Sequence, residues 1–378
     1  LVIYLIPPTA VLGAILLIYW FAYQGDAVSQ ARRLMGQNQI SAATGLLERH
    51  VQENPHDAAA QFLLGRSYWM NRQYADAAAA FEAAADSDAS NRDAFMLAAL
   101  AYAHGNTATD RERAEAVLDR MVRHFPNDAE AWHLLGLVRS ANGNYAQGAR
   151  ALEEALALDP SLVRGRTFLG IAKALQQDYP DARSHLDAAL NARPEDADLR
   201  AALGFVSGLE GDAPQAQEAL RTAIQNNTKV KSLALTQLAR HLILSGNFSG
   251  AVEQLNQAVT ADATNETAKF LYGISLQAVG RLDDAITTFN ELSQGSGPYA
   301  ADSAVLAAQA YVSQQKLDRA REAINRAMSL GAQGPFAYTV KGRMHALAGE
   351  DNDAREAFKQ AIAADSQYAP AYLEYGLF

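Results

Sequence analysis

Residues 54–84 read NPHDAAAQFLLGRSYWMNRQYADAAAAFEAA. Gly65, a small residue, stands within an apolar stretch, a second small residue, Ala77, follows twelve positions later, and Phe81 follows four positions after that. The segment between the two stretches, Asn71-Arg72-Gln73, is polar, which is typical of a short turn. We therefore expect two antiparallel helices that cross closely at the small residues, with Phe81 filling the space beside the crossing.

The same pattern recurs from residue 27 onward. One small residue marks each first helix, at Ala31, Gly65, Ala99, Gly136, Gly170, Gly204, Ala239, Gly273, Ala308, Gly342 and Gly376. A large apolar residue follows most markers by sixteen positions, at Phe81, Leu152, Leu186, Leu220, Leu255, Phe289, Ile324 and Phe358, and by nineteen at Leu118. Proline after the second helix stops several units, at Pro55, Pro126, Pro160 and Pro194. A period near 34 residues predicts an all-α array with a core continuous between neighbours.

The quoted segment and residues 125–156, FPNDAEAWHLLGLVRSANGNYAQGARALEEAL, resemble the tetratricopeptide repeat (TPR) family. The resemblance implies a right-handed superhelix of about ten helix-turn-helix repeats and a half repeat. In the longer third unit we expect residues 106–113, NTATDRER, to form an extended turn. The last segment, Ala369 to Phe378, is expected to be a first helix without its partner, and its apolar end suggests that the natural chain continues.

Residues 1–25, LVIYLIPPTAVLGAILLIYWFAYQG, carry no charged side chain. As a helix, Leu1 to Tyr23 would span about 35 Å, enough for a bilayer core of about 30 Å. Tyr19, Trp20 and Tyr23 gather at one end, as at a membrane interface. A cleaved signal peptide or a buried soluble helix fits less well, because the stretch is long and apolar on every face. We expect a transmembrane helix over 1–25 and a repeat array over 26–378.

The charges that follow this segment favour one topology. Only Arg32 and Arg33 follow it closely, behind Asp26, and this deficit of positive charge favours an array outside the cytoplasm. We expect an inner-membrane protein with a single visible span and a periplasmic array, in contact with the lipid bilayer.

Composition and motifs exclude several classes of function. The formal net charge is −10 and no basic cluster stands out, so nucleic acid is not an expected partner. The chain has no cysteine, and it contains no zinc-protease, nucleophile-elbow, phosphate-loop or dinucleotide-binding motif. The sequence thus offers no catalytic residue, no cofactor site and no metal motif, and a scaffold is expected rather than an enzyme.

In the resembled fold, first helices line a concave groove that binds protein segments. The repeat register places mostly apolar residues and scattered arginines there, which suits an amphipathic helix or an extended segment rather than the acidic terminus of a chaperone. The expected groove residues are Phe62, Arg66, Trp69, Met70, Met96, His104, His133, Leu137, Ile171, Leu175, Phe205, Leu209, Arg240, Ile243, Phe270, Ile274, Val312, Phe336, Arg343 and Leu347.

Residues 47–156 also look like the repeat subunit of the bacterial cytochrome c maturation system, which has a span before a periplasmic array with one lengthened unit. The resemblance implies that the groove grips apocytochrome c for haem ligation, with contacts from Phe62, Trp69, Met70, Met96, His133 and Leu137. Two other roles stay open: a structural subunit of a stable membrane complex for secretion, pilus assembly, polysaccharide export or respiration, and a regulator of an envelope enzyme.

Overall fold

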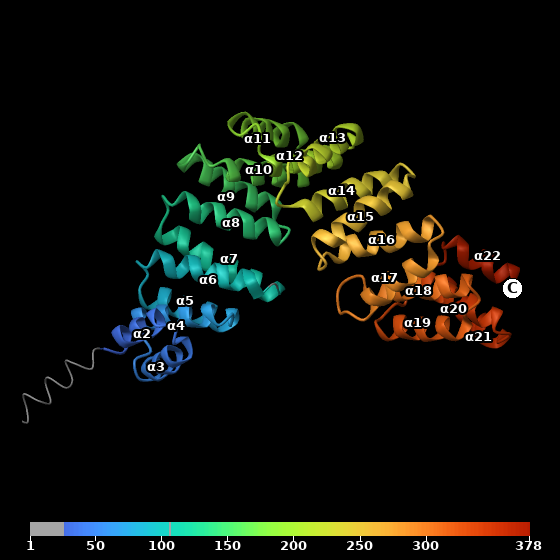
Figure 1. The fold of residues 1–378 in the computed structure, drawn as a ribbon, viewed down its shortest axis with the longest axis horizontal. Helices are drawn as coiled ribbons and strands as arrows, with labels where there is room; N and C mark the ends of the chain where they lie inside the picture. The colour runs from blue at the N-terminus through green and yellow to red at the C-terminus, as the bar shows by residue number, and fades with distance from the viewer. Residues whose placement is uncertain (1–25, 106) are drawn as a thin grey trace, which may run out of the picture. The chain divides into compact units, whose positions relative to one another are not determined.

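The computed structural model describes residues 26–105 and 107–378, where every regular element is a helix (Figure 1). The first helices of the repeats are α2 (Ala27–Gly36), α4 (Ala58–Met70), α6 (Arg92–Gly105), α8 (Ala129–Ala141), α10 (Val163–Leu175), α12 (Ala197–Glu210), α14 (Lys231–Leu244), α16 (Glu266–Ala278), α18 (Ala300–Ser313), α20 (Pro335–Leu347) and α22 (Ala369–Leu377). The second helices are α3 (Ile40–Glu53), α5 (Tyr74–Ser87), α7 (Ala108–His124), α9 (Tyr145–Leu158), α11 (Tyr179–Ala192), α13 (Ala213–Gln225), α15 (Phe248–Ala261), α17 (Leu282–Ser293), α19 (Leu317–Ser329) and α21 (Asp351–Ala364).

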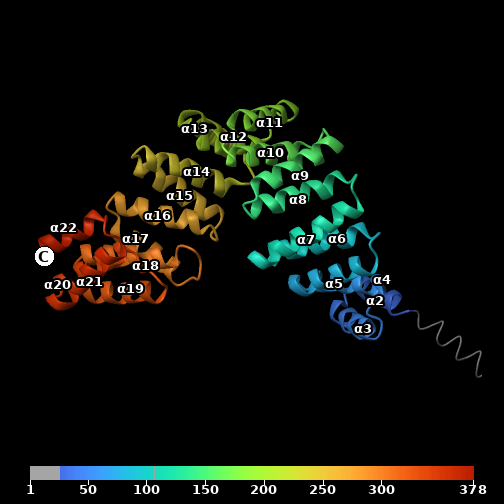
Figure 2. The same ribbon diagram turned by 180° about the vertical axis from the view of Figure 1, so that it is seen from behind.

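This order confirms the expected ten helix pairs and unpaired last helix over the described residues. Contacts divide the chain into two compact units: unit 1, which ends at Ala189 in the last turn of α11, and unit 2, which begins at Leu190. Within each unit the pairs stack side by side in chain order, as both views show (Figures 1 and 2).

The close crossings predicted from the small residues are present. A Cβ built on Gly65 would stand 2.6 Å from the Phe81 ring, and one on Gly204 would stand 2.7 Å from Leu220. The large residue of each pair is at most 1% exposed from Phe81 to Phe358. A larger side chain at the marker would thus displace the residue that fills the core beside it.

A row of polar contacts ties consecutive repeats of unit 1 together. Three residues after the marker, a side chain on the first helix reaches an acid on the preceding second helix. Tyr68 donates to Glu48 over 2.7 Å and Tyr102 to Glu82 over 2.6 Å. Lys173 Nζ lies 2.8 Å from Glu153. This position therefore serves the stacking of one repeat on the next.

The long third unit differs from the expectation for residues 106–113. Helix α7 already begins at Ala108, so the added residues lengthen this helix to 17 residues instead of forming an extended turn. The Thr107 side chain accepts from the Asp110 backbone N–H over 3.0 Å, and the Asp110 carboxylate accepts in return from Thr107. This capping box starts the helix early and explains why the residues from Ala108 onward are helical.

The predicted membrane helix, Leu1–Tyr23, lies outside the described residues, together with Tyr19, Trp20 and Tyr23. None of the helices from α2 to α22 combines the length and the apolar character needed to cross a bilayer.

The turns inside the repeats share one backbone device. In the nine turns that lie wholly within the described residues, one residue has a positive φ, which lets the chain reverse within two or three residues. Five of these residues are glycine, whereas Asn38, Arg72, Gln177 and Gln315 carry a side chain there. A side chain in the left-handed region costs about 1 kcal/mol relative to glycine.

Replacing Gln315 (φ 56°) with glycine should therefore stabilise unit 2 by about 0.5–1 kcal/mol. The measurement is the urea midpoint of the purified protein. The control is Gln37→Gly, at φ −89°, where glycine relieves no strain and should give no stabilisation. Equal effects of both substitutions would contradict this account of the turns.

Candidate protein-binding surface

The predicted groove residues all lie on first helices, with different exposure. Arg66, Met70, His104, Leu209, Arg240 and Leu347 are exposed, whereas His133 and Val312 are buried. The others are half-buried: Phe62, Trp69, Met96, Leu137, Ile171, Leu175, Phe205, Ile243, Phe270, Ile274, Phe336 and Arg343. Most of the predicted positions are thus at least partly open to a partner.

The first helices form the inner side of each unit. In unit 1, α2 contacts α4 and α8 contacts α10; in unit 2, first helices are in contact from α12 to α16 and from α18 to α22. No pair of successive second helices among the described residues has contacts of comparable extent. Helices lie closer together on the inside of a curved stack than on its outside. A side chain on a first helix that points away from the second helix of its repeat therefore faces the inside of the curve.

Three aromatic side chains gather where α4, α5 and α6 meet in unit 1. The Tyr74 ring stacks on His104 with 4.6 Å between centroids, and Trp69 meets both rings edge-on, 5.3 Å from Tyr74 and 5.1 Å from His104. Trp69 also packs against the core, while Met70 beside it is 51% exposed. A rigid aromatic cluster with an exposed neighbour is typical of the anchor points of protein interfaces.

His133 does not present its ring to a partner as expected. It is 8% exposed, packs 5.9 Å from Phe168 between ring centroids, and has no hydrogen-bond partner for Nδ1 among the described residues. Phe168 of α10, at 38% exposure, covers this part of α8. Burial lowers the pKa of His133, and the charge of Arg164 lowers it further. The imidazole is therefore neutral at pH 7.

Stability should accordingly fall as the pH drops below about 6.5, the ordinary pKa of histidine. Below this pH, His133 binds a proton in the unfolded chain but not in the folded one, because its pKa is lower in the folded state. Stability is therefore lost as the pH falls, until it reaches the lowered pKa of the folded state. Burial lowers the pKa of His185 and His241 in the same direction. The melting temperature should drop when the pH is lowered from about 7.5 to about 5.5. His133→Gln should reduce this drop; an unchanged drop would contradict the role given to His133.

Charge is distributed unequally between the two helix sets of unit 1. Its five first helices carry 8 Lys and Arg against 2 Asp and Glu, whereas its five second helices carry 7 against 13. Arg66 and Arg164 are exposed, and neither pairs with an acid among the described residues. Arg92, Arg139 and Lys173 form ion pairs with acids, so the exposed positive charge that can meet a partner includes Arg66 and Arg164.

Sequence reasoning missed several exposed apolar side chains on the same helices. Leu100 of α6 is 38% exposed, and it follows its marker by one position, as Arg66 does. In unit 2, Leu233 and Leu244 of α14 are 54% and 83% exposed. The repeat register could have found Leu100 and Leu244, whereas Tyr74 lies on a second helix and joins the cluster only through the fold.

We define the inner surface of unit 1 as Phe62, Arg66, Trp69, Met70, Met96, Leu100, His104, Leu137, Arg164, Phe168, Ile171 and Leu175.

Among curated proteins, the chain is similar to a cytochrome c-type biogenesis protein, CycH of Pseudomonas aeruginosa, with 31% identity over 166 residues. The match covers 43% of this chain and 39% of the relative, so the chain spans about two fifths of the length of that protein.

Solved structures share the fold at low identity. A tetratricopeptide repeat protein from Parabacteroides merdae matches with a TM-score of 0.56 and 14% identity, over 66% of this chain and 98% of its own. Yeast Tom70 matches with a TM-score of 0.53 and 19% identity, over 78% of this chain and 59% of its own.

Two family profiles match the sequence. The profile of the bacterial transcriptional activator domain matches residues 174–296. The tetratricopeptide repeat profile matches 28–92, 64–110, 107–162, 134–198, 270–338 and 305–369, well over half of the sequence. With the helix pairs and the close crossings at the small residues, these matches show that the chain belongs to the tetratricopeptide repeat family.

Proposed function

We propose that this chain is a non-catalytic scaffold that holds a segment of another protein on the inner surface of unit 1 during the assembly of envelope proteins. The observation that carries the proposal is the combination of the Trp69–Tyr74–His104 cluster, the exposed Met70 and Leu100, and the unpaired Arg66. Such a surface offers apolar anchors and positive charge along one side of several stacked helices.

The surface chemistry specifies the partner segment further. The apolar side chains suit a segment with one apolar face. The exposed Arg66 and Arg164, which have no acidic partner among the described residues, suit acidic residues on its flanks. We therefore infer that the occupant is an amphipathic, acidic helix or extended segment.

The most specific version of the role is cytochrome c maturation, in which the segment belongs to apocytochrome c. The similarity to the cytochrome c-type biogenesis protein supports this version. A membrane helix in residues 1–25, with the array on the periplasmic side, would place the surface beside newly exported chains; the uncharged sequence of that segment supports this arrangement.

The test is purification of the tagged full-length protein from native membranes in mild detergent, with mass spectrometry of the proteins that accompany it. We expect apocytochromes and haem-ligation proteins. A fixed-ratio set of other membrane subunits, without maturation proteins, would contradict the cytochrome version and make the chain a structural component of that complex.

A further inference from the structure

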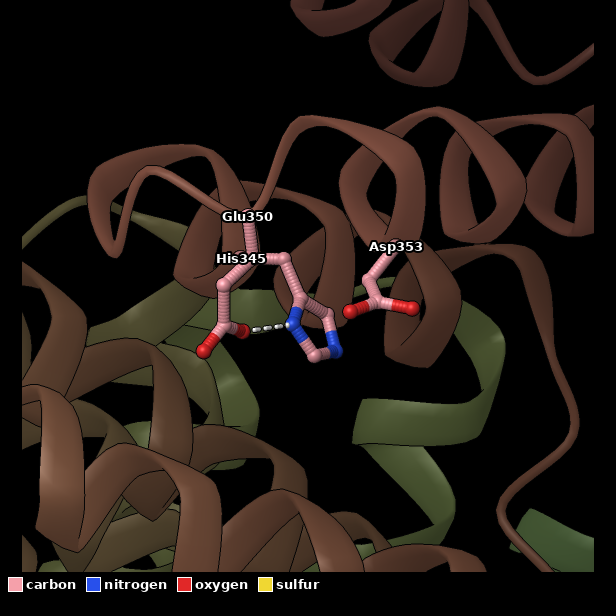
Figure 3. A group of neighbouring side chains, drawn as sticks. All are labelled: His345, Glu350 and Asp353. Atoms are coloured by element: carbon pink, nitrogen blue, oxygen red, sulfur yellow. Dashed lines mark hydrogen bonds and ion pairs between the residues drawn. The ribbon is translucent and has the colours of Figure 1, made fainter.

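Three potential metal ligands meet at the turn between α20 and α21 in unit 2 (Figure 3). His345 lies in the last turn of α20, Glu350 caps α21, and Asp353 lies in its first turn. His345 Nδ1 lies 2.5 Å from Glu350 Oε2, and one donor atom from each residue lies within 4.8 Å of the other two. In Figure 3 the carboxylates of Glu350 and Asp353 stand on either side of the imidazole ring.

The imidazole is held in place, whereas the acids remain accessible. His345 is 8% exposed, Glu350 is half-buried, and Asp353 is exposed. The Glu350 N–H donates to the His345 carbonyl over 2.9 Å, and Gly349 between them has a φ of 73°, so the turn fixes the backbone of two of the three residues.

Negative charge exceeds positive charge around this turn. Arg321 donates to Glu350 Oε1 over 2.6 Å, and this bond raises the pKa of Arg321, with further contributions from the charges of Asp318 and Asp353. Arg321 thus contacts one carboxylate, that of Glu350, and engages the Glu350 oxygen that does not face the histidine, while the charges of Asp318 and Asp353 act on it without a contact. A second cation would balance the remaining charge.

The fifth repeat shows how the same positions are filled without an added ion. Counted from the marker glycine, His345, Glu350 and Asp353 correspond to Lys173, Asp178 and Asp181. There the Lys173 ammonium lies 3.1 Å from Asp181 and 2.8 Å from Glu153, so the chain supplies its own cation between the acids. In the tenth repeat an imidazole replaces the ammonium, and this side chain can donate a lone pair to a metal.

We propose that His345, Glu350 and Asp353 bind one divalent transition-metal ion of the Zn²⁺ class. One imidazole nitrogen and two carboxylate oxygens form a ligand set that Zn²⁺ accepts, at about 2.0–2.2 Å from each donor. The exposed Asp353 can rotate inward, and the short His345–Glu350 pair has to open slightly to admit the ion. Three protein ligands leave a coordination position for water or for a ligand from another molecule.

The experiment uses the full chain without a histidine tag, stripped of metal with a chelator and then titrated with Zn²⁺ by calorimetry. Co²⁺, whose visible absorption reports its coordination, serves as a second probe. We expect one ion per chain, and a rise in melting temperature when it binds.

His345→Lys places in the tenth repeat the ammonium that the fifth repeat uses, and Asp353→Asn removes one ligand from an exposed position. Both should weaken Zn²⁺ binding by at least about tenfold. Circular dichroism and the melting temperature in chelator check the fold of each variant. The matched control is His185→Gln, because His185 lies 3.6 Å from a single acid, Asp181, and should be no metal ligand.

No saturable binding to the unmodified chain, or equal affinity in the chain and in both variants, would overturn the proposal. Loss of binding in His185→Gln with retention in His345→Lys would overturn it as well, because the ion would then bind in unit 1.

Discussion

Replacing Gly170 with alanine is expected to destabilise the protein by about 1–3 kcal/mol, although alanine is the better helix former. A Cβ at this position would stand 2.9 Å from the carbonyl oxygen of Ala182 in α11 and 3.0 Å from Leu186. The carbonyl belongs to the helix backbone, so relief of the contact requires the two helices of the repeat to separate. The measurement is the free energy of unfolding from urea titration.

Gly45→Ala is the matched control. Gly45 also lies within a helix, α3, but a Cβ there would meet nothing within 4 Å. This substitution should stabilise the protein by about 0.5–1 kcal/mol through helix propensity alone. Opposite signs for the two substitutions are the expected result; destabilisation of similar size at both sites would contradict the account of the crossings.

Reversing the charge of Arg66 should weaken partner binding by at least about tenfold, or about 1.4 kcal/mol. Arg66 is exposed next to Trp69 and Met70 and has no acidic partner among the described residues, so Arg66→Glu leaves the fold intact. The loss follows because a glutamate would repel the acidic flank of the bound segment. The measurement is the dissociation constant for the captured partner, at low and at physiological salt.

Arg150→Glu provides the control for this prediction. Arg150 is also exposed but lies on α9, a second helix, and the substitution makes the same change in net charge. It should leave the dissociation constant within about twofold, whereas equal losses from Arg66→Glu and Arg150→Glu would mean that net charge, not the inner surface, governs binding.

The sequence predicted the parts of this fold that depend on local spacing. The small marker residue and the large apolar residue are sixteen positions apart in every repeat of normal length, as Gly65 and Phe81 are. This spacing is enough to place one against the other. The prediction for residues 106–113 is wrong, because the length of an insertion does not show whether it extends a turn or a helix. The Thr107–Asp110 capping box, which is local in the sequence, starts α7 at Ala108.

The candidate surface was only partly predictable. The register placed Arg66 and Met70 on the exposed side of α4, but it could not show that Phe168 from the next repeat buries His133. Such contacts depend on how far one repeat is rotated on the next, which spacing within a repeat does not determine. For the same reason, no motif drew attention to His345, Glu350 and Asp353, whose proximity depends on a turn between two helices.

The most direct test of the central claim is site-specific photo-crosslinking in native membranes. A photoreactive side chain at Leu100, on the inner surface of unit 1, is compared with one at Ala79, which is exposed on the second helix α5. We predict that a partner protein is captured from Leu100 and not from Ala79. Capture of the same partner from Ala79, with none from Leu100, would contradict the assignment of binding to the inner surface.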